Sequence, residues 1–312
     1  MLKDTDVTEV LKTAKQGGVT LLDSAEGYGG GTSEARLGNL ASSDDFVLVT
    51  KFLPAPWRWT EAQFNASLAA SAARMGVKTI PLYFLHTPVH PLPLEYWVRL
   101  LVKAKLDGRI AAIGLSNCDA EQVQRAITAA APTRIDCIQI HFSLVCGASQ
   151  ALQKVVQLCK DNDIAILGFS PIAQGLLVDG LTDDKFASSR IAKVTRVKRD
   201  NLEPLRLTIS EIAKGHQVTM AQVAINWSLC KGIIPLIGVR TVKQALDAIA
   251  ATKWHLTDEE VKRLDSHALA LHTFEKPRVV RSFAVIVIAV LMVAYKAEKL
   301  LVGLGLLTRP PL

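Results

Sequence analysis

Short apolar segments alternate with longer amphipathic segments between residues 19 and 239. The short segments are rich in β-branched residues, and we predict strands at 19–23, 46–51, 81–86, 110–117, 135–143, 165–170 and 233–239. The stretches between them, such as TEAQFNASLAASAARMG and ALQKVVQLCKDND, carry apolar residues at helical spacing and end near Gly or Asn. This alternation is typical of βα units, and it predicts an α/β fold with a parallel sheet.

Nearly every predicted strand is apolar along its length and ends in, or close to, a polar side chain. These side chains are Asp23, Lys51, His86, Ser116 with Asn117, Gln139 and Ser170. Residues at the carboxyl ends of several strands form the active site of a parallel barrel, so we expect a (β/α)8 TIM barrel with one ring of site residues. A doubly wound sheet is the weaker alternative, because no GxGxxG fingerprint follows the first strand.

Composition limits the classes of protein that fit. The length of 312 residues and the 49% of hydrophobic residues suit one large domain. The net charge of +7 is spread along the chain, which argues against nucleic-acid binding and suits a small anionic ligand such as a nucleotide. Five cysteines without CxxC spacing favour neither a disulfide framework nor a zinc site, so we expect no metal and a reducing compartment.

The two ends of the chain raise separate questions. The first residues show neither a secretory signal nor a transit peptide, so the sequence alone leaves the cytoplasm and a plastid open. Residues 283–295, FAVIVIAVLMVAY, are uncharged, and a second apolar run reaches residue 307. Three interpretations stay open for 283–307: membrane attachment, a surface helix, or a strand at 283–290 that completes the barrel between the last predicted strand and 19–23.

Several motifs in this chain resemble those of the aldo-keto reductases. They are DSAEGYGGGTSEARLG, VTKF, YFLH, GLSN, FSPIAQGLL and IPLIGVRTVKQ, and they follow the family's order over about residues 1–272. PWRW and WHLTDEEVKRL are most similar to chloroplast members from green plants. The resemblance implies a barrel domain over residues 1–275 that lacks the family's first strand, because the chain begins within the first helix of the pattern. Residues 276–312 depart from the family.

The resemblance implies reduction of a small carbonyl substrate to an alcohol with NADPH, and it assigns four catalytic residues. Tyr28 is the implied proton donor. Its ordinary pKa is near 10, so we expect the cation of Lys51 to favour the phenolate and Asp23 to hold that cation in place. His86 is implied to orient the carbonyl. Without the resemblance, an Asp23–Lys51 ion pair that supports the barrel end and a packed His86 remain the structural alternatives.

The resemblance also assigns the residues that bind the cofactor. Ser116, Asn117 and Gln139 match the positions that hold the nicotinamide carboxamide, and Phe169 matches the aromatic residue that stacks on the ring. The loop that wraps the pyrophosphate corresponds to Ser170, Pro171, Ile172, Gln174 and Gly175. The segment near the last strand that holds the adenosine 2′-phosphate corresponds to Gly238, Arg240 and Gln244, and Ala248 stands where many members have Asn.

Some questions stay open at this stage. His141 either lines the pocket or packs in the core, and Trp57 and Trp59 form either an apolar substrate wall or a stiff loop. The main alternative functions are a non-catalytic NADP-binding regulatory protein and an inactive truncated form. The oligomeric state cannot be inferred from these patterns.

Overall fold

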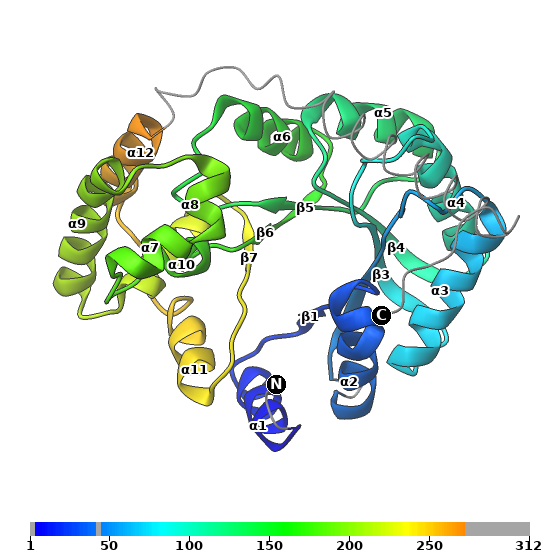
Figure 1. Ribbon diagram of the computed structural model, residues 1–312, viewed down its shortest axis with the longest axis horizontal. Helices are drawn as coiled ribbons and strands as arrows, with labels where there is room; N and C mark the ends of the chain where they lie inside the picture. The colour runs from blue at the N-terminus through cyan, green and yellow to red at the C-terminus, as the bar shows by residue number, and fades with distance from the viewer. Residues whose placement is uncertain (1–3, 42–44, 272–312) are drawn as a thin grey trace, which may run out of the picture.

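The structure is a computed structural model that describes residues 4–41 and 45–271. Within those residues seven parallel strands form one sheet in the order of the chain, and the helices surround it (Figure 1). The strands are β1 (Leu21–Asp23), β2 (Val47–Phe52), β3 (Ile80–Leu85), β4 (Ile110–Ser116), β5 (Cys137–His141), β6 (Ala165–Phe169) and β7 (Ile234–Leu236). The predicted α/β barrel is confirmed. In the described residues, β1 and β7 each pair with one strand, so the barrel is nearly closed.

The helices lie outside the sheet, where the amphipathic segments predict them. They are α1 (Asp4–Gln16), α2 (Thr32–Leu40), α3 (Glu61–Met75), α4 (Leu94–Leu106), α5 (Ala120–Ala130), α6 (Gln150–Asp161), α7 (Asp183–Ser188), α8 (Arg190–Thr195), α9 (Arg199–His216), α10 (Met220–Cys230), α11 (Val242–Ala250) and α12 (Asp258–Ala270). Two 3-10 turns, η1 (Tyr28–Gly31) and η2 (Ala173–Gly175), follow β1 and β6. Thr60 and Gln63 form a capping box that starts α3, and Gly76 ends that helix at φ 67°.

The edge strands are shorter than the sequence pattern predicts. The N–H of Val19 donates to the carbonyl of Ala14, which closes the end of α1 and delays β1 until Leu21. Ile233 follows α10, and its N–H likewise donates to the carbonyl of Ser228 in the last turn of that helix, so β7 begins at Ile234. Apolar character alone does not show where a backbone group is already bonded to a neighbouring turn.

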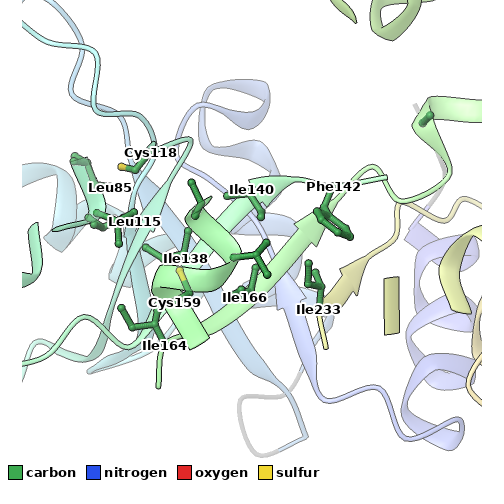
Figure 2. Close-up of a cluster of buried hydrophobic side chains, with 14 of the residues drawn as sticks. Leu85, Leu115, Cys118, Ile138, Ile140, Phe142, Cys159, Ile164, Ile166 and Ile233 are labelled. Atoms are coloured by element: carbon green, nitrogen blue, oxygen red, sulfur yellow. The ribbon is translucent and has the colours of Figure 1, made fainter. Parts of the chain in front are cut away.

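The larger apolar core lies between the sheet and its helices. Figure 2 shows part of it, where side chains from several strands meet Cys159 of α6; the labelled strand residues are Leu85, Leu115, Ile138, Ile140 and Ile166. A smaller cluster fills the barrel itself and contains Val49, Leu82, Phe84, Cys137 and Leu167. Gly114 of β4 is required there, because a Cβ atom at this position would lie 2.3 Å from the ring of Phe84.

The interpretations of the C-terminal segment concern residues that the structure does not describe. The divergent segment 276–312, the replacement strand at 283–290 and membrane attachment through 283–307 all lie outside the described residues. Over residues 4–41 and 45–271, none of the helices combines the length and the apolar character that crossing a bilayer requires.

A buried carboxylate connects α2 to β2 and α3 beneath the loop that follows β1. Glu34 is fully buried, accepts a hydrogen bond from Thr50 Oγ1 at 2.5 Å, and accepts another from Arg74 Nε at 2.7 Å. Thr50 precedes Lys51 in β2, so this carboxylate fixes the strand that carries Lys51.

We expect Glu34→Ala to lower the free energy of unfolding by about 2 kcal/mol, because it leaves the Arg74 cation and the Thr50 hydroxyl without their buried partner. Urea denaturation of the full chain measures the loss. Glu9→Ala is the control, since Glu9 is exposed on α1. Equal stability of the two variants would contradict the role given to Glu34.

Candidate active site

Alternation along the strands places the predicted polar residues on the inner face of the barrel. The members of the inner cluster, Val49 in β2 and Leu82 and Phe84 in β3, share that face with residues two positions further along each strand. In β2 that residue is Lys51, at the end of β3 it is His86, which directly follows the strand, and in β5 Gln139 follows Cys137 in the same way. The inward columns of β2, β3 and β5 therefore start apolar and end polar at the carboxyl end of the strand.

Lys51 is the best-connected polar residue of this ring. Its side chain is fully buried, and its Nζ lies 2.6 Å from Asp23 Oδ2 and 2.6 Å from the backbone oxygen of Ser24. Burial lowers the pKa of Lys51, and the charge and hydrogen bond of Asp23 act against that shift. The predicted Asp23–Lys51 pair is present, and it joins the end of β1 to β2.

Tyr28 lies beside this pair in η1. Lys51 Nζ is 5.0 Å from the centroid of the Tyr28 ring, so the contact is made with the ring face. Burial raises the pKa of Tyr28, and the negative charge of Asp23 raises it further. The cation of Lys51 is expected to favour the phenolate, whereas burial and Asp23 favour the protonated hydroxyl in the free protein.

His86 faces Tyr28 from the end of β3. The ring centroids are 5.7 Å apart at an interplanar angle of 81°. Burial lowers the pKa of His86, and the charge of Lys51 lowers it further, so the imidazole is neutral at neutral pH. Its backbone N–H donates to the carbonyl of Phe52 at 2.8 Å, which fixes the start of the loop after β3. Tyr28, Lys51 and His86 therefore meet at one place.

The amide side chains continue the ring across the barrel mouth. Gln139 Nε2 donates to Asp23 Oδ1 at 3.0 Å, which connects β5 to β1. Asn117 adopts a left-handed backbone at φ 61°, and its Nδ2 donates to Ser116 Oγ at 3.0 Å and to the backbone oxygen of His86 at 3.1 Å. The structure therefore brings Ser116, Asn117 and Gln139 together with the predicted catalytic residues.

Two stacked aromatic side chains continue the circle of site residues from β5 to β6. His141 stacks on Phe169 with ring centroids 5.2 Å apart and an interplanar angle of 18°. Both residues line the main cavity, and burial lowers the pKa of His141. The two interpretations of His141 thus both apply, because it packs on a neighbour and faces the cavity.

The loop after β6 has a tightly wound backbone. Ser170, Ala173 and Gln174 have φ values of 58°, 49° and 53°, and Gly175 reaches 96°. Ser170 and Gln174 line the cavity, while Pro171 is buried beneath the loop. Successive N–H groups in such conformations form a concave surface that suits an anion.

The predicted phosphate-binding residues lie around the start of α11. Gly238 lines the cavity, whereas Arg240 and Gln244 are exposed next to it. Gln244 Oε1 accepts a hydrogen bond from the N–H of Arg240 at 2.8 Å, and Thr241 caps the helix. A helix N-terminus with an adjacent guanidinium suits a phosphate group.

A cavity of about 1190 Å³ unites these groups. The residues at the carboxyl ends of the strands line it, including Asp23, Tyr28, His86, Asn117 and Phe169. Its volume exceeds the roughly 300–1,000 Å³ of common small-molecule sites, because it continues past the ring into the space between β1 and β7.

Glu26, which the sequence pattern does not single out, lies between two loops of the site. Glu26 accepts hydrogen bonds from the N–H of Leu53, from Arg58 and from Ser67. It therefore holds the loop after β2 against the loop that carries Tyr28. In the sequence, only its position three residues after Asp23 in the motif connects Glu26 with the site, because its hydrogen-bond partners lie far along the chain.

The tryptophans of the PWRW loop lie outside the cavity. Trp57 is 70% exposed, and the ring of Trp59 packs edge-on against His90 with centroids 5.2 Å apart. Neither side chain lines the cavity. The packing of Trp59 favours the stiff-loop interpretation over a substrate wall.

Comparison with known proteins identifies the family that the fold and this ring of residues suggest. The model of the Aldo/keto reductase family matches residues 2–269, and the chain belongs to that family. It is 31% identical to the chloroplastic pyridoxal reductase of Arabidopsis thaliana over 84% of this chain and 76% of that protein. It is 29% identical to aldo-keto reductase yakc [NADP(+)] of Schizosaccharomyces pombe, over 82% and 80%.

The fold matches as well. A crystal structure of a thermostable aldo-keto reductase in complex with the inhibitor epalrestat superposes with a TM-score of 0.70 and 26% identity. The match covers 85% of this chain and 88% of that chain.

We expect Lys51→Met to raise the pKa of His86 toward its ordinary value, because the variant removes the cation that disfavours imidazolium. Titration of the imidazole signals by NMR measures the change, and His86→Gln assigns the signal. His141 is the internal control, since burial alone lowers its pKa. A His86 signal that titrates as in the unmodified chain would show that Lys51 does not act on it.

Proposed function

We propose that this protein reduces aldehyde or ketone carbonyls to alcohols with NADPH, using Tyr28 as the proton donor. The observation that carries the proposal is the buried Lys51–Asp23 pair, whose cation lies over the ring of Tyr28, with His86 against that ring and a large cavity beside them. A carbonyl there would meet a protonated hydroxyl and a neutral imidazole. Family membership supports the same reaction class.

The residues around the cavity fit a nicotinamide dinucleotide. Ser116, Asn117 and Gln139 offer hydroxyl and amide groups for a carboxamide, and Phe169 has one face covered by His141, which leaves the other for a ring. The wound loop from Ser170 to Gly175, including Ile172, suits the pyrophosphate, and Arg240 with Gln244 suits the 2′-phosphate. The name of the S. pombe relative, which includes NADP(+), supports this choice. When bound, NADPH supplies the hydride.

The chain's own residues supply and control the proton. As hydride reaches the carbonyl carbon, negative charge develops on the oxygen, and the Tyr28 hydroxyl donates its proton there. The raised pKa of Tyr28 keeps that proton on the hydroxyl until the oxygen becomes basic. Lys51 then lies next to the phenolate that remains, where its cation stabilises the charge.

His86 orients the substrate. Its neutral imidazole can donate one hydrogen bond to the carbonyl oxygen without adding a second cation beside Lys51. Asp23 fixes Lys51, and Gln139 fixes Asp23, so the proton donor and the orienting group are held by connected strands.

The name of one relative also supports a substrate class and a compartment. The Arabidopsis relative is named a pyridoxal reductase, and its name supports an aldehyde as the substrate of this protein. The same name includes the chloroplast, which supports a plastid over the cytoplasm as its location.

We expect Tyr28→Phe to reduce the turnover of a generic aldehyde by at least about 100-fold, because it removes the general acid while keeping the ring that contacts Lys51. NADPH absorbance measures turnover, and fluorescence titration should show unchanged NADPH binding. Tyr96→Phe is the matched control, since Tyr96 lies on α4 and its hydroxyl bonds the backbone of Trp59.

The outcome also decides between this proposal and its main alternative. NADPH binding without turnover in the unmodified chain would favour a regulatory nucleotide-binding protein. Unchanged turnover in Tyr28→Phe would refute the proton-donor role of Tyr28.

We expect Arg240→Ala to weaken NADPH binding about tenfold and to leave NADH binding unchanged, because in this proposal the guanidinium binds the 2′-phosphate that only NADPH carries. Fluorescence titration with both nucleotides measures the difference. Lys253→Ala removes a cation after the other end of α11 and serves as the control. An equal loss for the two nucleotides would mean that Arg240 does not recognise the 2′-phosphate.

A further inference from the structure

Arg206 of α9 is a buried cation that has no part in the proton transfer. The residue is 9% exposed, and its Nε is buried without a hydrogen-bond partner in the described part of the chain. Glu203 Oε2 lies 3.7 Å from that nitrogen, beyond hydrogen-bonding distance, and the Glu203 side chain is 44% exposed. A buried guanidinium with so weak an ionic partner costs free energy, so its other contacts need an explanation.

Those contacts are made with the segment that follows the wound loop, Ser170 to Gly175. Arg206 Nη1 donates to the backbone oxygen of Leu176 and, at 2.9 Å, to the backbone oxygen of Val178. The two acceptors lie 30 and 28 positions before Arg206 in the chain. The guanidinium therefore joins α9 to the end of the wound loop.

The peptide group between Leu176 and Leu177 is held from both sides. Its carbonyl accepts from Arg206, and its N–H donates to the carbonyl of Ile172 in the wound loop at 3.4 Å. A peptide group is planar, so fixing its carbonyl also fixes the direction of its N–H. Leu176 and Leu177 are both buried, which anchors the same segment in the core. Arg206 thus acts on the wound loop through one peptide group.

The conformation of the wound loop needs such support. Ser170, Ala173 and Gln174 have φ values of 58°, 49° and 53°, although none of them is glycine. Left-handed backbone is unfavourable for residues with a side chain, and it persists only where the surroundings fix it. Ser170 and Gln174 line the cavity, so this part of the cavity wall depends on the contact with α9.

We propose that Arg206 is a positioning residue for the pyrophosphate of the nucleotide. It holds the peptide group between Leu176 and Leu177, and that group holds the wound loop in the conformation that turns its N–H groups toward an anion. Arg206 is not among the described residues that line the cavity, so it acts through the backbone. The inference rests on the proposed function, because that function places the pyrophosphate at the wound loop.

Two fragments of the nucleotide separate this role from a general loss of structure. 2′-phospho-ADP-ribose contains the pyrophosphate, whereas 2′,5′-ADP lacks it and keeps the adenosine and its 2′-phosphate. We expect Arg206→Met to weaken binding of 2′-phospho-ADP-ribose about tenfold and to change binding of 2′,5′-ADP less than about twofold. Isothermal titration calorimetry of the full chain measures both affinities. Arg206→Lys keeps a cation and should show a smaller loss with the same preference, and it carries the test if Arg206→Met does not fold.

Hydrogen exchange of the nucleotide-free chain tests the contact with the wound loop directly. We expect a peptide that covers 172–178 to exchange at least about tenfold faster in Arg206→Met, because the bonds to Arg206 no longer hold it. The peptide of β4 should exchange at its original rate and so show that the fold persists.

Arg263→Met is the matched control, since it removes an exposed guanidinium that binds Glu211 on the same helix. It should change neither the two affinities nor the exchange of 172–178. Equal losses for the two fragments, full affinity of Arg206→Met for 2′-phospho-ADP-ribose, or unchanged exchange of 172–178 would overturn the positioning role alone. Failure of the unmodified chain to bind either fragment would instead refute the proposed cofactor, and the positioning role with it.

Discussion

The ion pair between Lys51 and Asp23 is the interaction on which the rest of the site depends. A fully buried ammonium is tolerated only where acceptors take its hydrogen bonds. Lys51 Nζ donates to a carboxylate oxygen of Asp23 and to the backbone oxygen of Ser24, each at 2.6 Å. Burial raises the pKa of Tyr28 and lowers that of His86, and the pair adds to both shifts, through Asp23 at Tyr28 and through Lys51 at His86. Both neighbours of the pair are thereby held neutral, which is the protonation state that a proton donor and a hydrogen-bond donor need for carbonyl reduction.

Much of this arrangement could be predicted from the sequence because it follows from the two-residue period of strands. Several inward columns start with an apolar residue and end with a polar one, as in Val49 to Lys51, and parallel strands carry these ends to one rim. The four catalytic candidates are brought to that rim by the structure. The ends of the edge strands could not be predicted, since they depend on backbone bonds such as Ile233 to Ser228.

Contacts between residues that are far apart in the chain could not be predicted from the sequence either. Gln139 bonds Asp23 across 116 positions, and Glu26 finds Leu53, Arg58 and Ser67 on other elements. The direction of the Tyr28 pKa shift depends first on burial and then on the charge of Asp23, and burial follows from the packing of elements that are distant in the sequence. Asp23 ends β1, which is an edge strand of the sheet in the described part of the chain, so its bonds to Lys51 and Gln139 tie that edge to β2 and β5.

The central claim is that the residues around this cavity bind NADPH and a carbonyl compound, so that hydride passes from the nicotinamide to the carbonyl carbon. Incubation of the full chain with an aldehyde and NADPH deuterated at the nicotinamide carbon that donates hydride tests it most directly. The account predicts deuterium bound to the carbinol carbon of the alcohol product, detected by mass spectrometry and NMR. An alcohol product without deuterium, or bound NADPH that stays unoxidised with every aldehyde and ketone offered, would contradict it.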